Sequence, residues 1–171
     1  MNYFQRIKLR RQVKKYINRP LDICEILSRE SDTNVVVDTY EYFMRKYHWE
    51  IDECNSLHIK IFLLCVKYYG EIANGGISQF LANSSGDYAH QTADALHTIG
   101  ALDAENLLRE SFALFSDGVV PEDEVAKNTI LDEISETDAM MKLDTAAYNT
   151  DICNCCYQYL TTNKTQFLTN A

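Results

Sequence analysis

The chain has 171 residues, 46% of them hydrophobic and 24% charged, and this composition is typical of a folded globular protein rather than a disordered one. It contains only two prolines and six glycines, fewer than the many turns of a β-sandwich or barrel require. We therefore expect an all-α fold, a single compact domain of several helices joined by short turns. No run of about 18 apolar residues occurs, and the N-terminus lacks the apolar stretch of a signal peptide, so we expect a cytoplasmic protein.

The charge is distributed unevenly along the chain. The net charge is −9, yet residues 1–20 hold seven basic residues and no acidic one, whereas residues 21–171 hold nine basic against 25 acidic residues. We predict a basic N-terminal segment or helix over 1–20 and an acidic all-helical domain over 21–171. We expect the basic segment to lie across the acidic body, and contact with nucleic acid or a membrane surface is the alternative.

The first half of the acidic domain has the three- and four-residue spacing of apolar residues that is typical of amphipathic helices. Asn74 or Gly75 is expected to supply the left-handed residue that ends the second of these helices, and a short helix with Ile77, Phe80 and Leu81 on one side follows. The two longer helices are predicted around Val36, Tyr40, Phe43 and Tyr47, and around Ile59, Phe62, Val66, Tyr69 and Ala73.

The second half of the domain continues in helices. Ser84 and Asp87 have the spacing of a capping box and predict a helix start, Gly100 is expected to end that helix in a tight hairpin, and another start is predicted at Ser135 with Asp138. The last helix is expected to fray into the polar C-terminal residues. The buried stripes predicted for these helices are Ala89, Ala93, Leu96 and Ile99; Ala104, Leu108, Phe112 and Phe115; and Ala146, Thr150, Cys153, Tyr157 and Leu160.

Candidate catalytic residues are few. His90, Asp94 and His97 would share one face of a helix and form part of a metal site, but this face lies opposite the predicted buried stripe, so a solvated face is favoured over a metal-dependent hydrolase. The cysteines of "CNCC" at 153–156 lack the spacing of a zinc or redox pair, and no nucleophile elbow or phosphate-binding loop occurs. We expect no catalytic residue, no metal and no cofactor, and hence a protein that is not an enzyme.

Acidic residues are concentrated between residues 117 and 144, which hold nine acids and two lysines. We call residues 117–144 the acidic segment. Charge runs usually form solvated faces, but a fixed anionic surface also attracts a basic partner by long-range steering. The candidate binding residues are therefore Asp117, Glu122, Asp123, Glu124, Asp132, Glu133, Glu136, Asp138 and Asp144.

The stretch "EIANGGISQFLANSSG" at 71–86, followed by "ALHTIGA" at 95–101, resembles the bacterial DNA-mimic protein family of the DMP type, otherwise described as a domain of unknown function. The resemblance extends over about residues 35–160, and Ile77 and Leu81 stand where the family usually has aromatic residues. The residues that carry it are Glu71, Asn74, Gly75, Gly76, Gln79, Phe80, Asn83, Ser84 and Gly86, with Ala95, Leu96, Ile99, Gly100 and Ala101.

This resemblance implies an all-helical fold, a homodimer, and an acidic surface that occupies the DNA-binding face of a helix-turn-helix transcription factor. It brings no catalytic residues. We therefore expect a non-enzymatic interaction protein that acts in transcription regulation through a basic protein surface, with no membrane among its partners. The alternative is a small helical binding or structural module of unknown ligand whose acidity serves only solubility.

The motif also has a purely structural interpretation. Residues 74–76 are expected to form a helix-to-helix corner, and residues 83–86 are expected to form the next corner through caps. Glu71 and Gln79 are expected to hydrogen-bond across the first corner, beside unpaired helix-end groups. A small-molecule or peptide site at this corner is the functional alternative.

Overall fold

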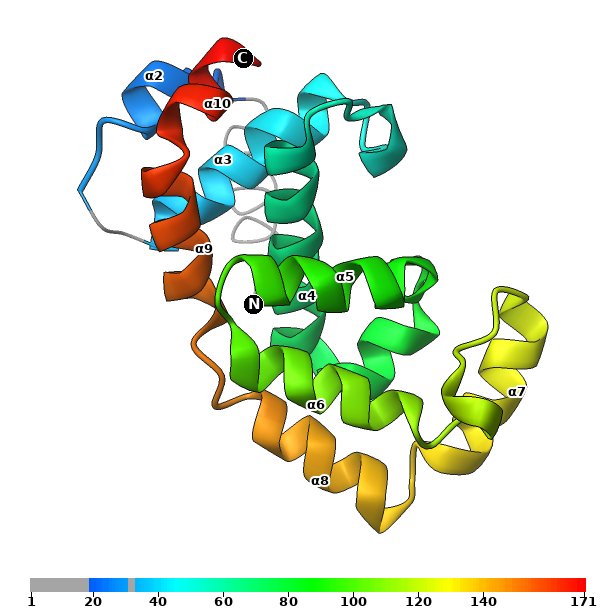
Figure 1. Cartoon of the computed structure of the whole chain (residues 1–171). Coiled ribbons are helices and arrows are strands. Elements are labelled where there is room, and N and C mark those ends of the chain that lie inside the picture. Colours follow the sequence, from blue (N-terminus) through cyan, green and yellow to red (C-terminus); the bar gives the residue numbers. More distant parts are fainter. Residues whose placement is uncertain (1–18, 31–32) are drawn as a thin grey trace, which may run out of the picture.

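The computed structural model describes residues 19–30 and 33–171, and Figure 1 shows their arrangement. Within these ranges the secondary structure consists of helices, which confirms the all-α prediction. The basic segment predicted over 1–20 lies outside the described residues, except for Arg19 and Pro20. The elements are α2 (Ile23–Ile26), α3 (Thr33–Lys46), η1 (Ile51–Glu53), α4 (Leu57–Ala82), η2 (Ser84–Tyr88), α5 (Ala89–Thr98), α6 (Leu102–Phe112), η3 (Ser116–Gly118), α7 (Glu124–Ile134), α8 (Asp138–Ala147), α9 (Ile152–Thr162) and α10 (Lys164–Thr169).

Helix α4 is the centre of the fold. Residues 62–66 are consecutive and buried, and because successive helical residues point about 100° apart, α4 has to be covered on every side. The covering helices are α3, α5, α7, α8, α9 and α10; Figure 1 shows α3 and α10 near the start of α4 and α8 near its far end. Neither α4 nor any other helix in the described part of the chain has the length and apolar character needed to cross a membrane.

The hydrophobic core follows most of the predicted stripes, although Ala73 is exposed and only Leu160 of the last stripe is buried. Val36, Phe43, Ile59 and Phe62 are fully buried, and the predicted stripes of α5 and α6 are buried as well. Each fully buried side chain of this size contributes roughly 1.5–3 kcal/mol relative to an exposed one. The amphipathic periodicity of these helices is therefore confirmed as the source of the core.

The predicted α5–α6 hairpin is confirmed at Gly100. This residue has φ +79, its N–H donates to the His97 carbonyl at 3.0 Å, and the N–H of Ala101 donates to the Leu96 carbonyl at 2.9 Å. This pair of bonds is the Schellman arrangement that closes a helix with a glycine in the left-handed conformation. The turn from α5 to α6 consequently takes only residues 99–101.

The predicted start at Ser135 is wrong by two residues. Ser135 follows the last residue of α7, and Thr137 caps α8 instead, its Oγ1 accepting from the Met140 N–H at 3.3 Å. A side-chain oxygen at this position satisfies a backbone donor in the first turn of the helix, and Thr137 stands directly before the first helical residue, Asp138. Ser135 and Thr137 both carry a hydroxyl group. Because α7 extends to Ile134, Ser135 lies at the C-terminal end of α7, and Thr137 is the residue that caps α8.

The C-terminal region differs from the prediction in two ways. Helices α8 and α9 are separate, broken between Ala147 and Ile152, rather than one helix from Ala146 to Leu160. The residues after Leu160 do not fray, because Phe167 of α10 is fully buried, with its ring 5.3 Å from that of Phe62 and 5.8 Å from that of Phe43. A single aromatic side chain in a polar stretch therefore anchors the last helix to the core.

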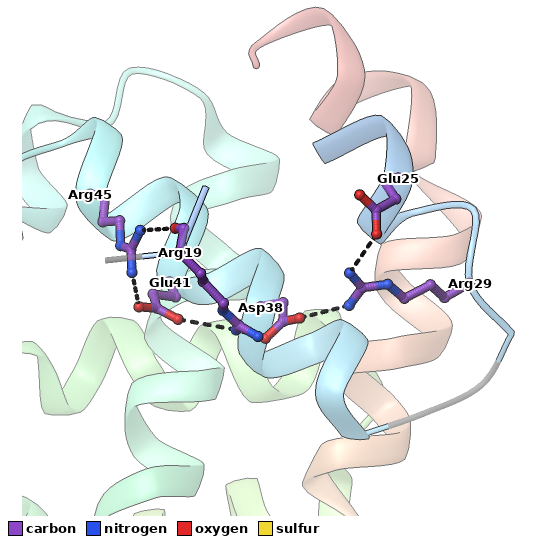
Figure 2. Close-up of polar contacts among 6 residues, drawn as sticks. All are labelled: Arg19, Glu25, Arg29, Asp38, Glu41 and Arg45. Atoms are coloured by element: carbon purple, nitrogen blue, oxygen red, sulfur yellow. Dashed lines mark hydrogen bonds and ion pairs between the residues drawn. The ribbon is translucent and has the colours of Figure 1, made fainter. Parts of the chain in front are cut away.

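An ion-pair network joins the N-terminal end of the described chain to α3 (Figure 2). The carboxylate of Asp38 is 2% exposed and accepts hydrogen bonds from Arg19 and, at 2.7 Å, from Arg29. Arg19 and Arg45 both pair with Glu41, and Arg45 also donates to the Arg19 carbonyl at 2.9 Å. This network ties Arg19 and the residues after α2 to α3.

Replacing Asp38 with asparagine is expected to lower the free energy of unfolding by about 2 kcal/mol. Removing one partner of a fully buried ion pair costs about 3–5 kcal/mol, and the expected loss is smaller than this range because the Arg19 and Arg29 side chains are 28% and 37% exposed and reach water. Urea unfolding measures the change. Glu25→Gln is the control, since Glu25 pairs with the same Arg29 but is 71% exposed, and its loss should cost less than about 0.5 kcal/mol. Equal effects of the two substitutions would contradict the prediction.

Candidate functional site

The corner inside α4 is formed by Gly75 and Gly76, which interrupt its helical backbone. Gly76 has φ +82 and ψ −168, a combination open essentially to glycine alone. Gly75 has an extended φ of −170, and a Cβ there would overlap the Gln79 side chain. The positive-φ residue predicted at Asn74 or Gly75 is therefore Gly76.

Asp144 of α8 reaches into this corner. Its Oδ1 accepts from the Ser78 backbone N–H at 2.9 Å, and its Oδ2 accepts from Ser78 Oγ at 2.7 Å. The Ser78 N–H lies in the first turn of the second part of α4, where a backbone donor lacks an intrahelical acceptor. Asp144 therefore caps this part of α4 from a different helix. Asp144 was a candidate for the acidic binding surface, and the structure places it half-buried in this internal contact.

Glu71 binds the second part of α4 to the first. Its Oε2 accepts from Gln79 Nε2 at 3.1 Å and from Asn83 Nδ2 at 2.8 Å, and its Oε1 accepts from Ser85 Oγ at 3.1 Å. The expected Glu71–Gln79 hydrogen bond is confirmed. Burial and, secondarily, the nearby Glu71 raise the pKa of Tyr40 to about 12. The polar residues of the motif thus satisfy one another across the corner.

The second corner, after Ala82, closes differently from the prediction. Ser84 is exposed and makes no cap bond, so the expected Ser84–Asp87 capping box is absent from η2. Ser85 is the buried serine, and its Oγ, besides its contact with Glu71, lies 3.1 Å from the Phe80 carbonyl oxygen. Gly86 lies so close to Leu81 that a Cβ would overlap the Leu81 carbonyl oxygen, which explains glycine at this position.

Lys127 is the residue of this region that the sequence analysis missed. Its side chain is 1% exposed and its Nζ lies 2.6 Å from Asp87 Oδ1, joining α7 to η2. The one sequence signal was its spacing, because Lys127 stands four residues before the buried Leu131 on the inner face of α7. In the sequence it was counted only as one of two cations within an acidic run.

The acidic segment extends over η3, α7 and α8 as far as Asp144. Asp123 caps α7, accepting from the Ala126 N–H at 2.8 Å, and the side chain of Asp117 lies outside the described residues. Apart from Asp144, the remaining carboxylates of the segment are exposed and make no hydrogen bond or ion pair with any described residue: Glu122, Glu124, Asp132, Glu133, Glu136 and Asp138. The segment therefore presents uncompensated negative charge on folded helices.

The face of His90, Asp94 and His97 does not form a metal site. Asp94 accepts from Arg109 Nη2 at 2.6 Å, and His97 Nδ1 lies 2.8 Å from Glu105 Oε2, while the His90 ring packs on Phe112 at 4.6 Å. No group of three potential ligands within the described ranges is arranged to hold a metal ion. The three side chains have separate partners, and the surface is an ion-pair cluster between α5 and α6.

Glu105 of this cluster predicts acid sensitivity. Hydrogen bonds from Arg109 and then from His97 hold the pKa of its carboxyl below the ordinary 4.5. A lowered pKa in the folded state adds stability above the unfolded-state value, and this stability is lost as the pH falls through the folded-state value. Between about pH 5 and about pH 3 the wild-type protein should therefore lose more stability than Glu105→Gln. Urea unfolding at each pH measures this, and Glu110→Gln, an exposed acid of the same helix, should behave like wild type.

Together these features define an acidic, all-helical protein in which a glycine-based motif fixes two helix corners beside an exposed anionic segment. A protein-family model described as DMP19-like protein matches residues 55–163, and the chain belongs to this DMP19-like family. The match includes both corners and the whole acidic segment, and it confirms the resemblance inferred from residues 71–101. No curated protein and no solved structure matches the chain.

Proposed function

We propose that this protein is a non-enzymatic interaction protein whose acidic segment binds the basic, DNA-binding face of a transcription factor or other nucleic-acid-binding protein. The observation that carries the proposal is the set of exposed carboxylates without cationic partners among the described residues on α7 and at the start of α8. Membership of the DMP19-like family supports it, since DNA mimicry is what the resemblance implies.

The acidic segment keeps a large excess of negative charge at the surface, since its internal contacts remove one acid, Asp144, and one lysine. One of its two lysines, Lys127, is buried against Asp87 and does not reach the surface. DNA-binding faces gain much of their affinity by neutralising phosphates with Lys and Arg. Carboxylates held in place on folded helices compete for the same cations, and such binding should weaken steeply with salt.

The test is capture of partners from a lysate of the source cells at low salt, with elution in a salt gradient. We expect a basic DNA-binding protein that elutes at moderate salt and is displaced by duplex DNA. The variant Asp132→Asn/Glu133→Gln/Glu136→Gln should lose this partner. The matched control is Glu50→Gln/Glu53→Gln/Glu110→Gln, which removes the same charge from exposed positions outside the acidic segment.

Two results would overturn the proposal. Equal loss of the partner in both triple variants would mean that overall charge, and not the acidic segment, governs binding, in line with a module whose acidity serves solubility. Recovery of nucleic acid alone, held through the basic residues 1–20, would point to a different activity. The homodimer implied by the resemblance stays a prediction, which sedimentation of the purified protein tests.

A further inference from the structure

Two hollows lie on either side of one residue, Gln91 of α5. The first, of about 630 Å³, is lined among others by Asp87, His90, Gln91, Val119, Pro121 and Glu122. The second, of about 450 Å³, is lined among others by Leu57, Ile61, Leu64 and Gln91. Figure 1 shows α5 crossing α4, with the first residues of α5 on the side of α7. We call this surface, from Val119 across Gln91 to Leu57, the α5 trough.

One end of the α5 trough is acidic. Glu122 is exposed and has no partner among the described residues, and Asp87 is 53% exposed although its Oδ1 is held by Lys127. The titratable groups that face this end are Asp87, His90 and Glu122, with the buried Lys127 behind Asp87. The walls between the carboxylates are apolar, since Val119 and Pro121 line the same hollow. This combination suits a long basic side chain, which buries its methylene groups on apolar surface and presents its charge to carboxylates.

The other end is apolar and electrically balanced. Leu57 is 71% exposed at the rim, and Ile61 and Leu64 are half-buried and buried below it. The two charged residues beside this hollow have partners of opposite charge: Lys60 Nζ lies 2.7 Å from Asp52, and Asp94 pairs with Arg109. An exposed leucine above a hollow floored by apolar side chains gains free energy when an apolar group covers it.

We infer that the α5 trough docks an amphipathic basic segment of a protein partner. A Lys or Arg side chain would enter the Asp87–Glu122 end, and an apolar side chain would cover Leu57 and Ile61. The inference rests on the proposed function, because it names where a basic partner makes its specific contacts beside the diffuse charge of the acidic segment. Hot spots of this kind, an anchor in a pocket surrounded by weaker contacts, dominate the affinity of protein interfaces.

The experiment uses the full chain and two fluorescein-labelled peptides of about twelve residues and about +4 charge. In the first peptide, leucines recur every three or four residues and share one face of a helix, and arginines occupy the opposite face. In the second peptide, serine replaces every leucine. Fluorescence anisotropy gives the dissociation constants for wild type, Leu57→Ser, Glu122→Gln and Glu133→Gln. Glu133→Gln is the matched control because Glu133 is an exposed acid of α7 that does not line either hollow.

We expect Leu57→Ser to weaken binding of the leucine peptide at least about fivefold and to leave binding of the serine peptide unchanged. Glu122→Gln should weaken both peptides by more than Glu133→Gln does. If both acid-to-amide variants weaken binding equally and Leu57→Ser has no effect, the trough is not the docking site, while the proposed function of the acidic segment stands. If neither peptide binds at low salt, the docking inference is overturned, and the partner-capture experiment decides the proposed function separately.

Discussion

Gly76→Ala should lower the free energy of unfolding by about 4 kcal/mol. The backbone at φ +82 and ψ −168 costs a residue with a side chain about 1–3 kcal/mol. The new Cβ would also lie 2.5 Å from Asp144 Oδ1, so the carboxylate has to leave Ser78, and its charged hydrogen bonds contribute about 1.5–3 kcal/mol. Urea unfolding of the purified variants measures the sum.

Two other glycines separate these contributions. Gly70 lies in the regular part of α4 with no atom within 4 Å of a Cβ, so Gly70→Ala should stabilise the protein by about 0.5–1 kcal/mol. Gly100 has φ +79 and open space around it, so Gly100→Ala should cost only the backbone strain, about 1–2 kcal/mol. A Gly76→Ala variant as stable as Gly100→Ala would mean that Asp144 moves aside at no cost, contrary to the cap described for Ser78.

Asp87→Ala should destabilise the protein by about 3 kcal/mol, whereas Lys127→Met should change stability by less than about 1 kcal/mol. The two residues form one ion pair, but the Lys127 side chain is 1% exposed and that of Asp87 is 53% exposed. Removing Asp87 leaves a buried ammonium without its carboxylate, while removing Lys127 leaves a carboxylate that already reaches water. Thermal and urea unfolding of both variants measure the asymmetry.

The double variant Asp87→Ala/Lys127→Met provides the control. It should be nearly as stable as Lys127→Met alone, because methionine occupies a similar volume and needs no partner. Equal costs for the two single substitutions would show that Lys127 reaches water when Asp87 is absent, and the pair would then not hold α7 against η2. Since α7 carries much of the acidic segment, its attachment also decides where those carboxylates stand.

Local patterns predicted the parts of this fold that depend on neighbouring residues. The spacing of Val36 and Phe43 identified the buried face of α3, and Gly100 marked the end of α5, because helix faces and glycine turns are set within a few residues. The two helix corners of the motif, predicted at residues 74–76 and 83–86, lie within two residues of their observed positions. Even the Glu71–Gln79 hydrogen bond was predictable, since its partners stand eight residues apart on either side of an expected corner.

The partners that the sequence analysis missed lie far apart along the chain. Lys127 and Asp87 are separated by 40 residues, and Asp144 and Ser78 by 66, so only the packed helices bring them together. Asp144 looked like any other acid of the acidic segment, and Phe167 stood in a polar stretch that gave no periodicity. The carboxylates of α7 were predicted as one group of candidate binding residues, but the division between surface and internal acids required the structure.

The capping of α4 by Asp144 has a consequence for biosynthesis. The donor, Ser78, leaves the ribosome 66 residues before its acceptor, which at the usual 5–20 residues per second corresponds to about 3 to 13 seconds. During that interval the second part of α4 carries an unsatisfied backbone donor at its start, and the Gly75–Gly76 corner is held only by the Glu71 side, whose donors follow within 14 residues. The nascent chain therefore passes through a stage in which the second part of α4 has no cap from Asp144. This stage ends when α8 emerges from the ribosome.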